Sequence, residues 1–462
     1  MTPARHIEFD TDEGTWLSLA VSPRDETIVF DMLGHLYAVN ADGGPARALT
    51  HGMAFDSQPV FSPDGTELAF ISDRSGAENL WVAKPDGSDP RQITHNDTPD
   101  EFVSPAFSPD GKSLYASLYR SDHNAAELWR FPLNAEPGEE LTGWSGEKAT
   151  GGAFDAAPFS ALGAAPSPDG KYIYYAAHVG PLFEDDVTLP MWAIERMDLA
   201  THARETIITN QGSAMRPVIS PDGKLLVYAV RIGAETGLRV RTLDSGADRA
   251  LIAPIERDDQ EALPTRDLVP SYAFTPDGQA ILAAIGGHIE RVDLATGAAR
   301  VIPFEAHVSL DLGPFLRQDI KTPTGPVKAT IIQWPVQSPD GGRVAFSALG
   351  RLYVMDLAPG AAPHELAAAL EPAFQPAWSP AGRTLAFVTW SRAGGGQIWT
   401  IPAAGGRPHP LTDIPAYYTD PAFSPDGRSV LALRSSAHER NEMGQEPLFT
   451  GRAFGPLRQA DL

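Results

Sequence analysis

The sequence "FSPDGTELAFISDRSGAENLWVAKPDGSDPRQIT", residues 61–94, contains one complete unit of the pattern that decides the fold. It opens with a Ser-Pro-Asp-Gly turn, in which proline presets one backbone angle, aspartate accepts local N–H groups and glycine takes a left-handed conformation. The residues after the turn alternate with the period of two that is typical of a strand. A second apolar strand, a Gly-containing turn and a short "QIT" strand follow. Together with the apolar segment before the turn, the unit predicts four short antiparallel strands.

The unit recurs along almost the whole chain. The turn is spelled Ser-Pro-Asp-Gly six times and in close variants three times, beginning at Ser22, Ser62, Ser108, Ser167, Ser220, Thr275, Ser338, Ser379 and Ser424. Successive turns stand 40 to 63 residues apart, which suits four strands joined by loops of variable length. Such repeats are the signature of propeller blades. The sequence therefore predicts an all-β protein, a β-propeller of four-stranded blades with nine repeat units.

The repeat is interrupted between residues 305 and 328, where the longest spacing falls. We expect a first propeller of six blades at residues 1–304, a linker at 305–330, and three further blades of a second, incomplete propeller at 331–462. The ninth unit has only its first two strands before the sequence reaches "PLRQADL". The alternative is a single ring of eight or nine blades, in which "RHIEFD" at residues 5–10 pairs as an outer strand to close the ring.

Composition narrows the classes of function. The chain has 462 residues and a formal charge of −23, so its field repels phosphate backbones and anionic membranes, and nucleic-acid binding is not expected. No apolar run reaches the ~18 residues of a membrane span, and the first residues lack the apolar core of a signal peptide. We therefore expect a soluble chain. The absence of cysteine excludes disulfides and thiolate sites but leaves the compartment open.

Residues 61–94 resemble a blade of the TolB-type propeller repeat, and this resemblance covers nearly the whole chain. Residues 13–65, which include "EGTWLSLAVSP" and "IVFDMLGHLYAVNADGG", resemble the start of the propeller region that precedes the metal-dependent barrel in bacterial imidazolonepropionase-like amidohydrolases. Residues 338–390, which include "SPDGGRVAFSALGRLYVMDL" and "PAWSPAGRTLAFVTW", resemble a later part of that region. The resemblance implies an amidohydrolase domain as partner and a periplasmic location. The barrel's His-x-His metal pair is missing, since none of the 12 histidines forms one.

The sequence contains no recognisable catalytic or metal-binding set. Local hydrogen bonding explains the aspartates of the repeated turns, namely Asp64, Asp110, Asp169, Asp222, Asp277, Asp340 and Asp426. Gly-x-Ser-x-Gly does not occur, and "HERNE" at residues 438–442 has Glu442 where a zinc helix needs its second histidine. The acidic loop Glu184-Asp185-Asp186 is a candidate contact element, although such loops are usually only solvated. We expect no cofactor and no metal.

The start of each innermost strand supplies the positional candidates for binding, because these ends line the mouth of a propeller's central channel. The residues just before the proline of each unit are Asp56, Asp100, Glu101, Asp155, Arg216, Arg266, Asp267, Tyr418 and Asp420. Their charge is mixed and mostly acidic, which suits cationic or polar peptide-like material. The recurring tryptophans Trp81, Trp129, Trp192 and Trp399 are expected to pack between blades.

We therefore expect a non-catalytic propeller that binds, gates or selects substrates for an amidohydrolase-like enzyme whose catalytic barrel lies outside these residues. The alternative is a freestanding TolB-like scaffold that binds a protein or peptide at the channel face. A third hypothesis is a propeller that is itself a glycosidase or lyase, with carboxylates recruited around the channel.

Overall fold

The computed structural model describes residues 3–121, 125–135, 137–143, 160–179, 190–260, 266–315, 321, 324–366, 370, 372–437 and 440. The chain divides into two compact units, Met1–Arg317 and Gln318–Leu462. Both are built from small sheets of antiparallel strands, which confirms the predicted β-propeller of four-stranded blades. Among the described residues, no helix has the length and apolar character needed to cross a bilayer.

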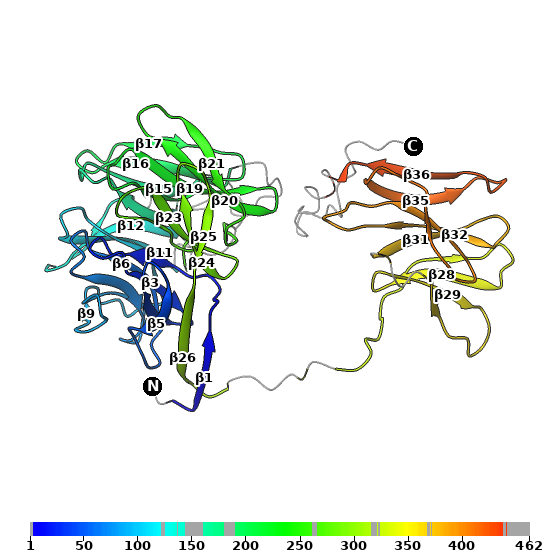
Figure 1. Cartoon of the computed structure of the whole chain (residues 1–462), viewed down its shortest axis with the longest axis horizontal. Coiled ribbons are helices and arrows are strands. Elements are labelled where there is room, and N and C mark those ends of the chain that lie inside the picture. The colour runs from blue at the N-terminus through cyan, green and yellow to red at the C-terminus, as the bar shows by residue number, and fades with distance from the viewer. Residues whose placement is uncertain are drawn as a thin grey trace. The chain divides into compact units, whose positions relative to one another are not determined.

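Six sheets form the blades of the first unit (Figure 1). Blade 1 contains β2 (Leu19–Val21), β3 (Ile28–Met32), β4 (His35–Val39) and β5 (Gly44–Ala48). Blade 2 contains β6 (Asp56–Phe61), β7 (Leu68–Ser72), β8 (Asn79–Ala83) and β9 (Arg91–Gln92). Blade 3 contains β10 (Glu101–Phe107), β11 (Ser113–Arg120), β12 (Ala125–Pro132) and β13 (Glu139–Glu140). Blade 4 contains β14 (Ala161–Pro166), β15 (Tyr172–His178), β16 (Trp192–Asp198) and β17 (Arg204–Ile208). Blade 5 contains β18 (Met215–Ile219), β19 (Leu225–Ile232), β20 (Glu235–Thr242) and β21 (Asp248–Ile252). Blade 6 contains β22 (Ala273–Phe274), β23 (Ala280–Ile285), β24 (His288–Asp293) and β25 (Ala299–Ile302).

The turn between β6 and β7 shows why the same four letters recur. Gly65 has a φ of 65° and donates its N–H to the Ser62 carbonyl at 2.8 Å. The Asp64 carboxylate accepts the Ser62 hydroxyl at 2.8 Å and the Thr66 N–H at 3.0 Å. Hydrogen bonds from Thr66 and Ser62 hold the pKa of Asp64 at about 2. The carboxylate of the turn aspartate is thus already hydrogen bonded within its own turn.

Each blade packs one face on each neighbour. In β7, Leu68 and Phe70 are buried in a cluster with blade 1, whereas Ala69 and Ile71 are buried in a cluster with blade 3. We call the side toward the preceding blade the leading face and the side toward the following blade the trailing face. Because alternate residues of β7 serve both faces, this strand is buried at all five positions.

The first unit is a closed ring of six. The trailing face of blade 6, with Leu282 and Ala284, shares a cluster with Leu19 and Phe30 of blade 1. The Leu19 N–H donates to the Ser271 carbonyl at 3.3 Å, and the Ser271 hydroxyl donates to the Leu19 carbonyl at 2.9 Å. Packing and hydrogen bonds thus join blade 6 to blade 1, and strands from both ends of the first unit extend the sheet of blade 1.

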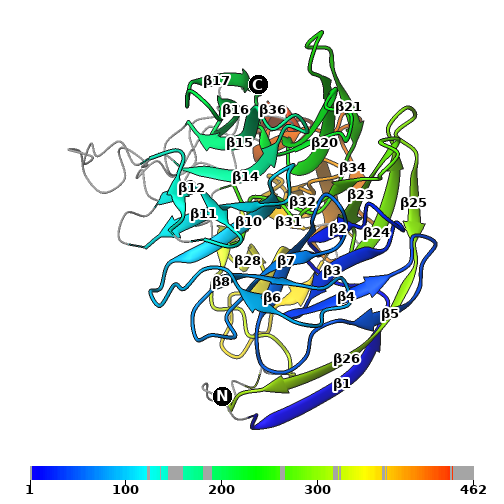
Figure 2. The same cartoon turned by 90° about the vertical axis from the view of Figure 1, so that its left-hand side faces the viewer.

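A strand occupies part of the interval for which a linker was expected. β26 (Phe304–Leu312) pairs in parallel with β5 and antiparallel with β1 (Arg5–Thr11), and the two strands lie side by side at the outer edge of blade 1 (Figure 2). Ala306, Val308 and Leu310 are buried against blade 1, while their sequence neighbours are exposed or half-buried. This alternation of apolar residues is present in the sequence, but the segment lacks the repeated turn and strand motifs of the blades. Residues 5–10 do form an outer strand, on β26.

The second unit contains three sheets. Blade 7 contains β27 (Gln333–Gln337), β28 (Arg343–Ala348), β29 (Arg351–Asp356) and β30 (His364–Glu365); blade 8 contains β31 (Ala373–Trp378), β32 (Thr384–Thr389), β33 (Ile398–Pro402) and β34 (His409–Pro410); blade 9 contains β35 (Tyr417–Phe423) and β36 (Val430–Ser435). One apolar cluster joins blades 7 and 8, and another joins blades 8 and 9.

Candidate functional site

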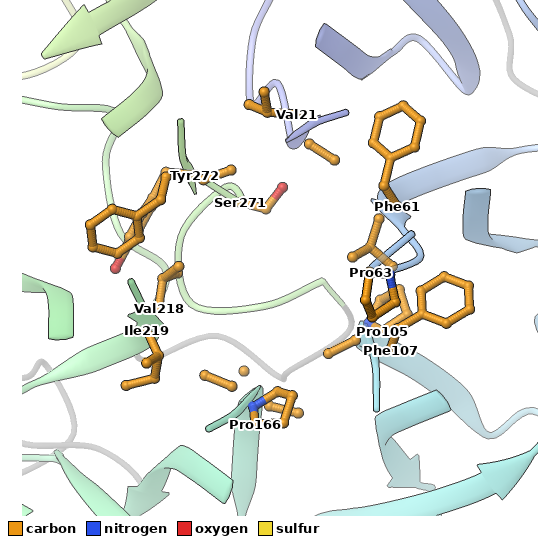
Figure 3. A pocket seen from close by; sticks show the side chains of 18 of the residues that line it. Val21, Phe61, Pro63, Pro105, Phe107, Pro166, Val218, Ile219, Ser271 and Tyr272 are labelled. Atoms are coloured by element: carbon orange, nitrogen blue, oxygen red, sulfur yellow. The ribbon is translucent and has the colours of Figure 1, made fainter. Parts of the chain in front are cut away.

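The central channel of the first unit holds a cavity of about 380 Å³. Its walls come from the innermost strands of all six blades, and Figure 3 shows their side chains arranged around a common opening. The lining is mainly apolar and rich in proline, with Val21, Phe61, Pro63, Pro105, Phe107, Pro166, Val218 and Ile219 among its residues. No carboxylate occurs among the described residues that line it.

The prolines of the repeated turns form one end of this cavity. Pro23, Pro63, Pro168 and Pro221 all belong to those turns and line the cavity. A proline ring has no backbone N–H and almost no conformational freedom to lose. This end of the cavity is therefore a rigid apolar opening, and its side chains need not reorder when an apolar ligand binds.

A network of polar side chains closes the other end. The Arg216 guanidinium of blade 5 forms an ion pair with the Asp267 carboxylate, and it donates to the Ser104 hydroxyl of blade 3 at 3.1 Å. The Ser104 hydroxyl in turn donates to Asp267, while the Ser104 N–H donates to Gln58 Oε1 of blade 2 at 2.7 Å. We call Gln58, Ser104, Arg216 and Asp267 the channel floor.

The channel floor blocks the passage through the ring. Ser104 stands on blade 3 and Asp267 at the start of blade 6, on opposite sides of a ring of six, yet their side chains are hydrogen bonded. Protein atoms therefore fill the axis at this level. Gly163 of blade 4 completes the circle, since a Cβ there would lie 3.3 Å from the Arg216 Cα and 3.6 Å from Asp267 Oδ2. The cavity is a blind pocket that opens on the side of the turn prolines.

A repeated backbone feature places the floor residues. Gln58, Ser104 and Arg216 each directly precede the proline of an inner strand, and they have φ values of 52°, 56° and 42°. The pairing register of β6, β10 and β18 shifts at these residues, as in a β-bulge. A bulge re-aims a side chain, here toward the axis. Left-handed backbone is costly for such residues, so the neighbouring blades must hold it in place.

The charges of the floor nearly balance. Burial lowers the pKa of Arg216 to about 10, so the guanidinium stays protonated at neutral pH. Asp31 on β3 accepts the Ser18 N–H at 2.7 Å and the Gln58 N–H at 2.8 Å, and burial raises its pKa to about 7. No described residue accepts a hydrogen bond from the buried Arg216 Nε. The Nε atom itself has almost no solvent-accessible surface, so protein atoms enclose it although the Arg216 residue lines the cavity.

The structure separates most of the residues expected at the channel mouth. Arg216 and Asp267 come together in the floor. The Asp56 side chain is fully buried and forms an ion pair with Arg74 at 2.7 Å, within blade 2. Arg266 is exposed and forms an ion pair with Asp259 at 3.1 Å.

Asp100 and Glu101 lie at the start of β10, outside the cavity lining. Asp100 forms an ion pair with Arg120 at 3.2 Å. Glu101 lies near Glu78 of blade 2, and each has a buried Oε2 for which no described residue is a hydrogen-bond partner. Burial, with the charge of Glu101 as the second cause, raises the pKa of Glu78 to about 7. This carboxylate pair stands apart from the channel.

The remaining expected residues lie elsewhere. Tyr418 and Asp420 belong to the second unit, where the Tyr418 hydroxyl donates to the Ile414 carbonyl at 2.9 Å. Asp155, the loop 184–186 and Glu442 fall outside the described residues. Trp192 is buried and donates its Nε1–H to the Gln260 carbonyl at 3.0 Å, as a packing residue does. Within the described part of the chain, no group of three or more His, Asp or Glu side chains could hold a metal ion.

Sequence reasoning missed Gln58, Ser104 and Asp31. A usable signal existed for the first two, because "QP", "SP" and "RP" place one residue directly before each inner-strand proline. Most of the residues expected at the channel stand further upstream. Asp31 lies on a second strand and had no such signal.

Comparison with known proteins agrees with the propeller architecture. Residues 20–175 match the family model of the Tricorn protease N-terminal beta propeller domain. The uncharacterized peptidase YuxL of Bacillus subtilis (strain 168) is 28% identical over 184 residues, which are 40% of this chain and 23% of that protein. Dipeptidyl-peptidase 5 of Porphyromonas endodontalis is 34% identical over 87 residues, 19% of this chain and 12% of that protein. The matches thus span less than a third of the length of either relative.

Among solved structures, TolB from Acinetobacter baumannii has a TM-score of 0.45 and 17% sequence identity, and the alignment covers 63% of this chain and 65% of that one. The family-model match and the repeated four-stranded blades support a β-propeller. The amidohydrolase association expected from the resemblance is not shown by these similarities.

Proposed function

We propose that the first unit binds a ligand in its blind channel and that the chain serves as the binding and substrate-selecting region of a hydrolase. The observation that carries this proposal is the preformed cavity of about 380 Å³ with proline-rich walls and a polar floor. Preformed apolar cavities with a few placed polar groups are the usual form of a ligand site. Because the floor blocks the axis, the ligand enters and leaves at the turn prolines, and the first unit is not a passage.

The ligand that fits is an apolar, uncharged, peptide-like segment. The walls offer apolar contact, and no Asp or Glu is among the described residues that line them. The charge of Arg216 is already matched by Asp267, so a carboxylate on the ligand would enter an apolar site without a counterion. A neutral amide end costs less to bury than a carboxylate. This chemistry replaces the cationic or polar material expected from the sequence.

Two kinds of hydrolase are compatible with the proposal. The sequence resemblance implies an amidohydrolase barrel, whereas the named relatives are peptidases. In either case, this region would hold apolar segments of the substrate near a catalytic domain, in the periplasm if the resemblance extends to location. A freestanding protein-binding scaffold is the second candidate, favoured by large exposed apolar residues such as Trp334 and Leu431 in the second unit.

The test is calorimetric titration of the full chain with N-acetyl-Leu-Pro-amide and with the free acid N-acetyl-Leu-Pro. We expect the amide to bind more tightly than the acid at pH 7.5. Val218→Trp, which fills the cavity, should weaken amide binding at least about tenfold. Val301→Trp, on the exposed outer strand β25, is the matched control and should leave binding unchanged. Equal binding by the two variants would place the ligand elsewhere and overturn the proposal.

A further inference from the structure

One sheet edge of the first unit is long, regular and unpaired among the described residues. β1 is the outermost strand of its sheet, in the order β1-β26-β5-β4-β3-β2, and no described strand pairs with its other side (Figure 2). Its seven residues pair with β26 in unbroken register. The outermost strands of blades 2 to 6 are shorter, with two to five residues each. β1 is therefore the edge at which another strand has the most room to add.

The pairing of β26 shows which backbone groups β1 leaves on this edge. The Gly44 N–H of β5 donates to the Pro303 carbonyl at 2.9 Å, so the odd-numbered residues at this point of the chain turn their N–H and C=O groups toward β5. The even-numbered residues of β26 therefore face β1, where they pair with odd-numbered residues. Successive residues of a strand alternate in this way. His6, Glu8 and Asp10 are thus left with N–H and C=O groups on the open edge.

The two faces of β1 differ in chemistry. Ile7 and Phe9, which are 40% and 42% exposed, lie on the face whose β26 partners are buried against blade 1. His6, Glu8 and Asp10 lie on the other face, where His6 Nε2 is 3.0 Å from Glu8 Oε1. A strand added to this edge therefore needs apolar residues on one face, and charges complementary to His6 and Glu8 on the other. Another β1 strand has both.

We propose that a second copy of this chain pairs its β1 antiparallel to this edge, with the two-fold axis at Ile7. In that register, His6 of each copy lies opposite Glu8 of the other, and each such pair exchanges both of its backbone hydrogen bonds. Ile7 meets Ile7 of the second copy at the axis, and Arg5 lies opposite Phe9. Because the same surface serves both copies, the contact closes as a dimer.

Charge selects this register over its neighbours. An axis at Glu8 would place the two Glu8 carboxylates opposite each other, and an axis at Phe9 would place Glu8 opposite Asp10. Like charges directly opposite across a strand pair are destabilising. The axis at Ile7 instead places a histidine opposite each Glu8. Each chain carries a net charge of −23, so the contact is expected at physiological salt, which screens repulsion beyond about 8 Å.

The contact should strengthen as pH falls from 8 to 6. Hydrogen bonds to Glu8 and Asp311 raise the pKa of His6 above its ordinary value. The other charged groups on this face of β1 and β26 are Asp10 and His307, which form an ion pair at 2.8 Å. Protonated His6 attracts Glu8 of the second copy and neutral His6 does not, so the dissociation constant should rise at least about threefold from pH 6 to pH 8. His6→Gln should lessen this dependence, and a dimer that tightens as pH rises contradicts the pairing.

Disulfide formation tests the position of the axis, since the chain has no cysteine of its own. Ile7→Cys in the full chain should oxidise to a covalent dimer, because opposite residues that share no backbone hydrogen bonds lie closest together. Phe9→Cys is the matched control, on the same face and with nearly the same exposure. Its counterpart lies about 13 Å away along the strand, too far for a disulfide, so this variant should stay monomeric. Equal crosslinking of the two variants, or none in Ile7→Cys, overturns the proposal.

Mass measurement by light scattering supplies an independent readout. The full chain should pass from monomer to dimer mass as its concentration rises, because the contact of one strand pair is small and reversible. Glu8→Lys places a cation opposite His6 and should raise the dissociation constant at least about tenfold. Glu205→Lys, at an exposed acidic residue of β17, makes the same change of net charge and should leave the dimer intact. A monomer at all concentrations, a ladder of higher multiples, or equal effects of the two lysine variants overturns the proposal.

Discussion

Replacing Asp267 with alanine should destabilise the first unit strongly. The side chains of Asp267 and Arg216 are 2% and 12% exposed, so their ion pair lies in a nearly dry site. Asp267 also accepts the Ser104 hydroxyl and the Leu268 N–H, the latter at 2.6 Å. Asp267→Ala leaves the Arg216 charge buried without a counterion. Removing one partner of a buried pair costs about 3–5 kcal/mol in the free energy of unfolding.

The assay is urea unfolding of the full chain, combined with hydrogen–deuterium exchange to assign each transition to one of the two units. Glu205→Ala is the matched control, because Glu205 pairs with Arg196 at 2.6 Å at the surface. An exposed pair of this kind should cost less than about 1 kcal/mol. The double variant Arg216→Met/Asp267→Leu removes both charges and should recover most of the loss.

The refuting result is specific. If Asp267→Ala costs no more than Glu205→Ala, the floor is hydrated in solution and the channel is not closed there. In that case the double variant would also show no recovery. The blind pocket, and with it the restriction of entry to the turn prolines, would then be abandoned.

Three further outcomes follow from the same residues. Gly163→Ala should cost more stability than Gly170→Ala by urea unfolding: both glycines have a φ near 70°, but only the Cβ at 163 meets Arg216, at 3.3 Å. Asp31 and Glu78 have folded pKa values raised to about 7, so they hold protons that the unfolded chain has already released. The free energy of unfolding of the first unit should therefore fall as pH rises from 5 to 8, by up to about 1.4 kcal/mol per pH unit for each group. This slope should lessen in Asp31→Asn. Gln375→Ala should cost about 1 kcal/mol in the second unit by removing the acceptor of the Asp420 N–H, while Gln337→Ala, at an exposed position of β27, should cost less.

The blades could be predicted because local chemistry determines them. Ser62, Asp64 and Gly65 act within their own turn, and the sequence of β7 is a short, almost wholly apolar run that the structure buries at all five positions. β26 was missed for a related reason: its alternation of Ala306, Val308 and Leu310 is equally clear, but it pairs in parallel with β5, some 260 residues earlier. Short-range patterns indicate a strand, and they say little about its partner.

The channel floor could not be predicted in the same way. Ser104 and Asp267 are 163 positions apart, and they meet only because six blades close a ring. The charge of Asp267 was visible in the sequence, but its partner Arg216 was assigned to a separate place at the mouth. Ring closure turns a set of independent strand ends into one buried network. A rule based on the residue directly before each inner-strand proline identifies Gln58, Ser104 and Arg216 together.

That rule also extends to the second unit. The residues before its inner-strand prolines are Trp334, Gln375 and Asp420, all with φ near 50°. Gln375 of blade 8 uses this position as Gln58 does in blade 2, because its Oε1 accepts the Asp420 N–H at 3.0 Å and the Gln58 Oε1 accepts the Ser104 N–H at 2.7 Å. In both units, a side-chain oxygen before one inner-strand proline therefore hydrogen bonds to the bulge of the next blade. The two units share this backbone plan, and the side chains at the bulges are what distinguish them.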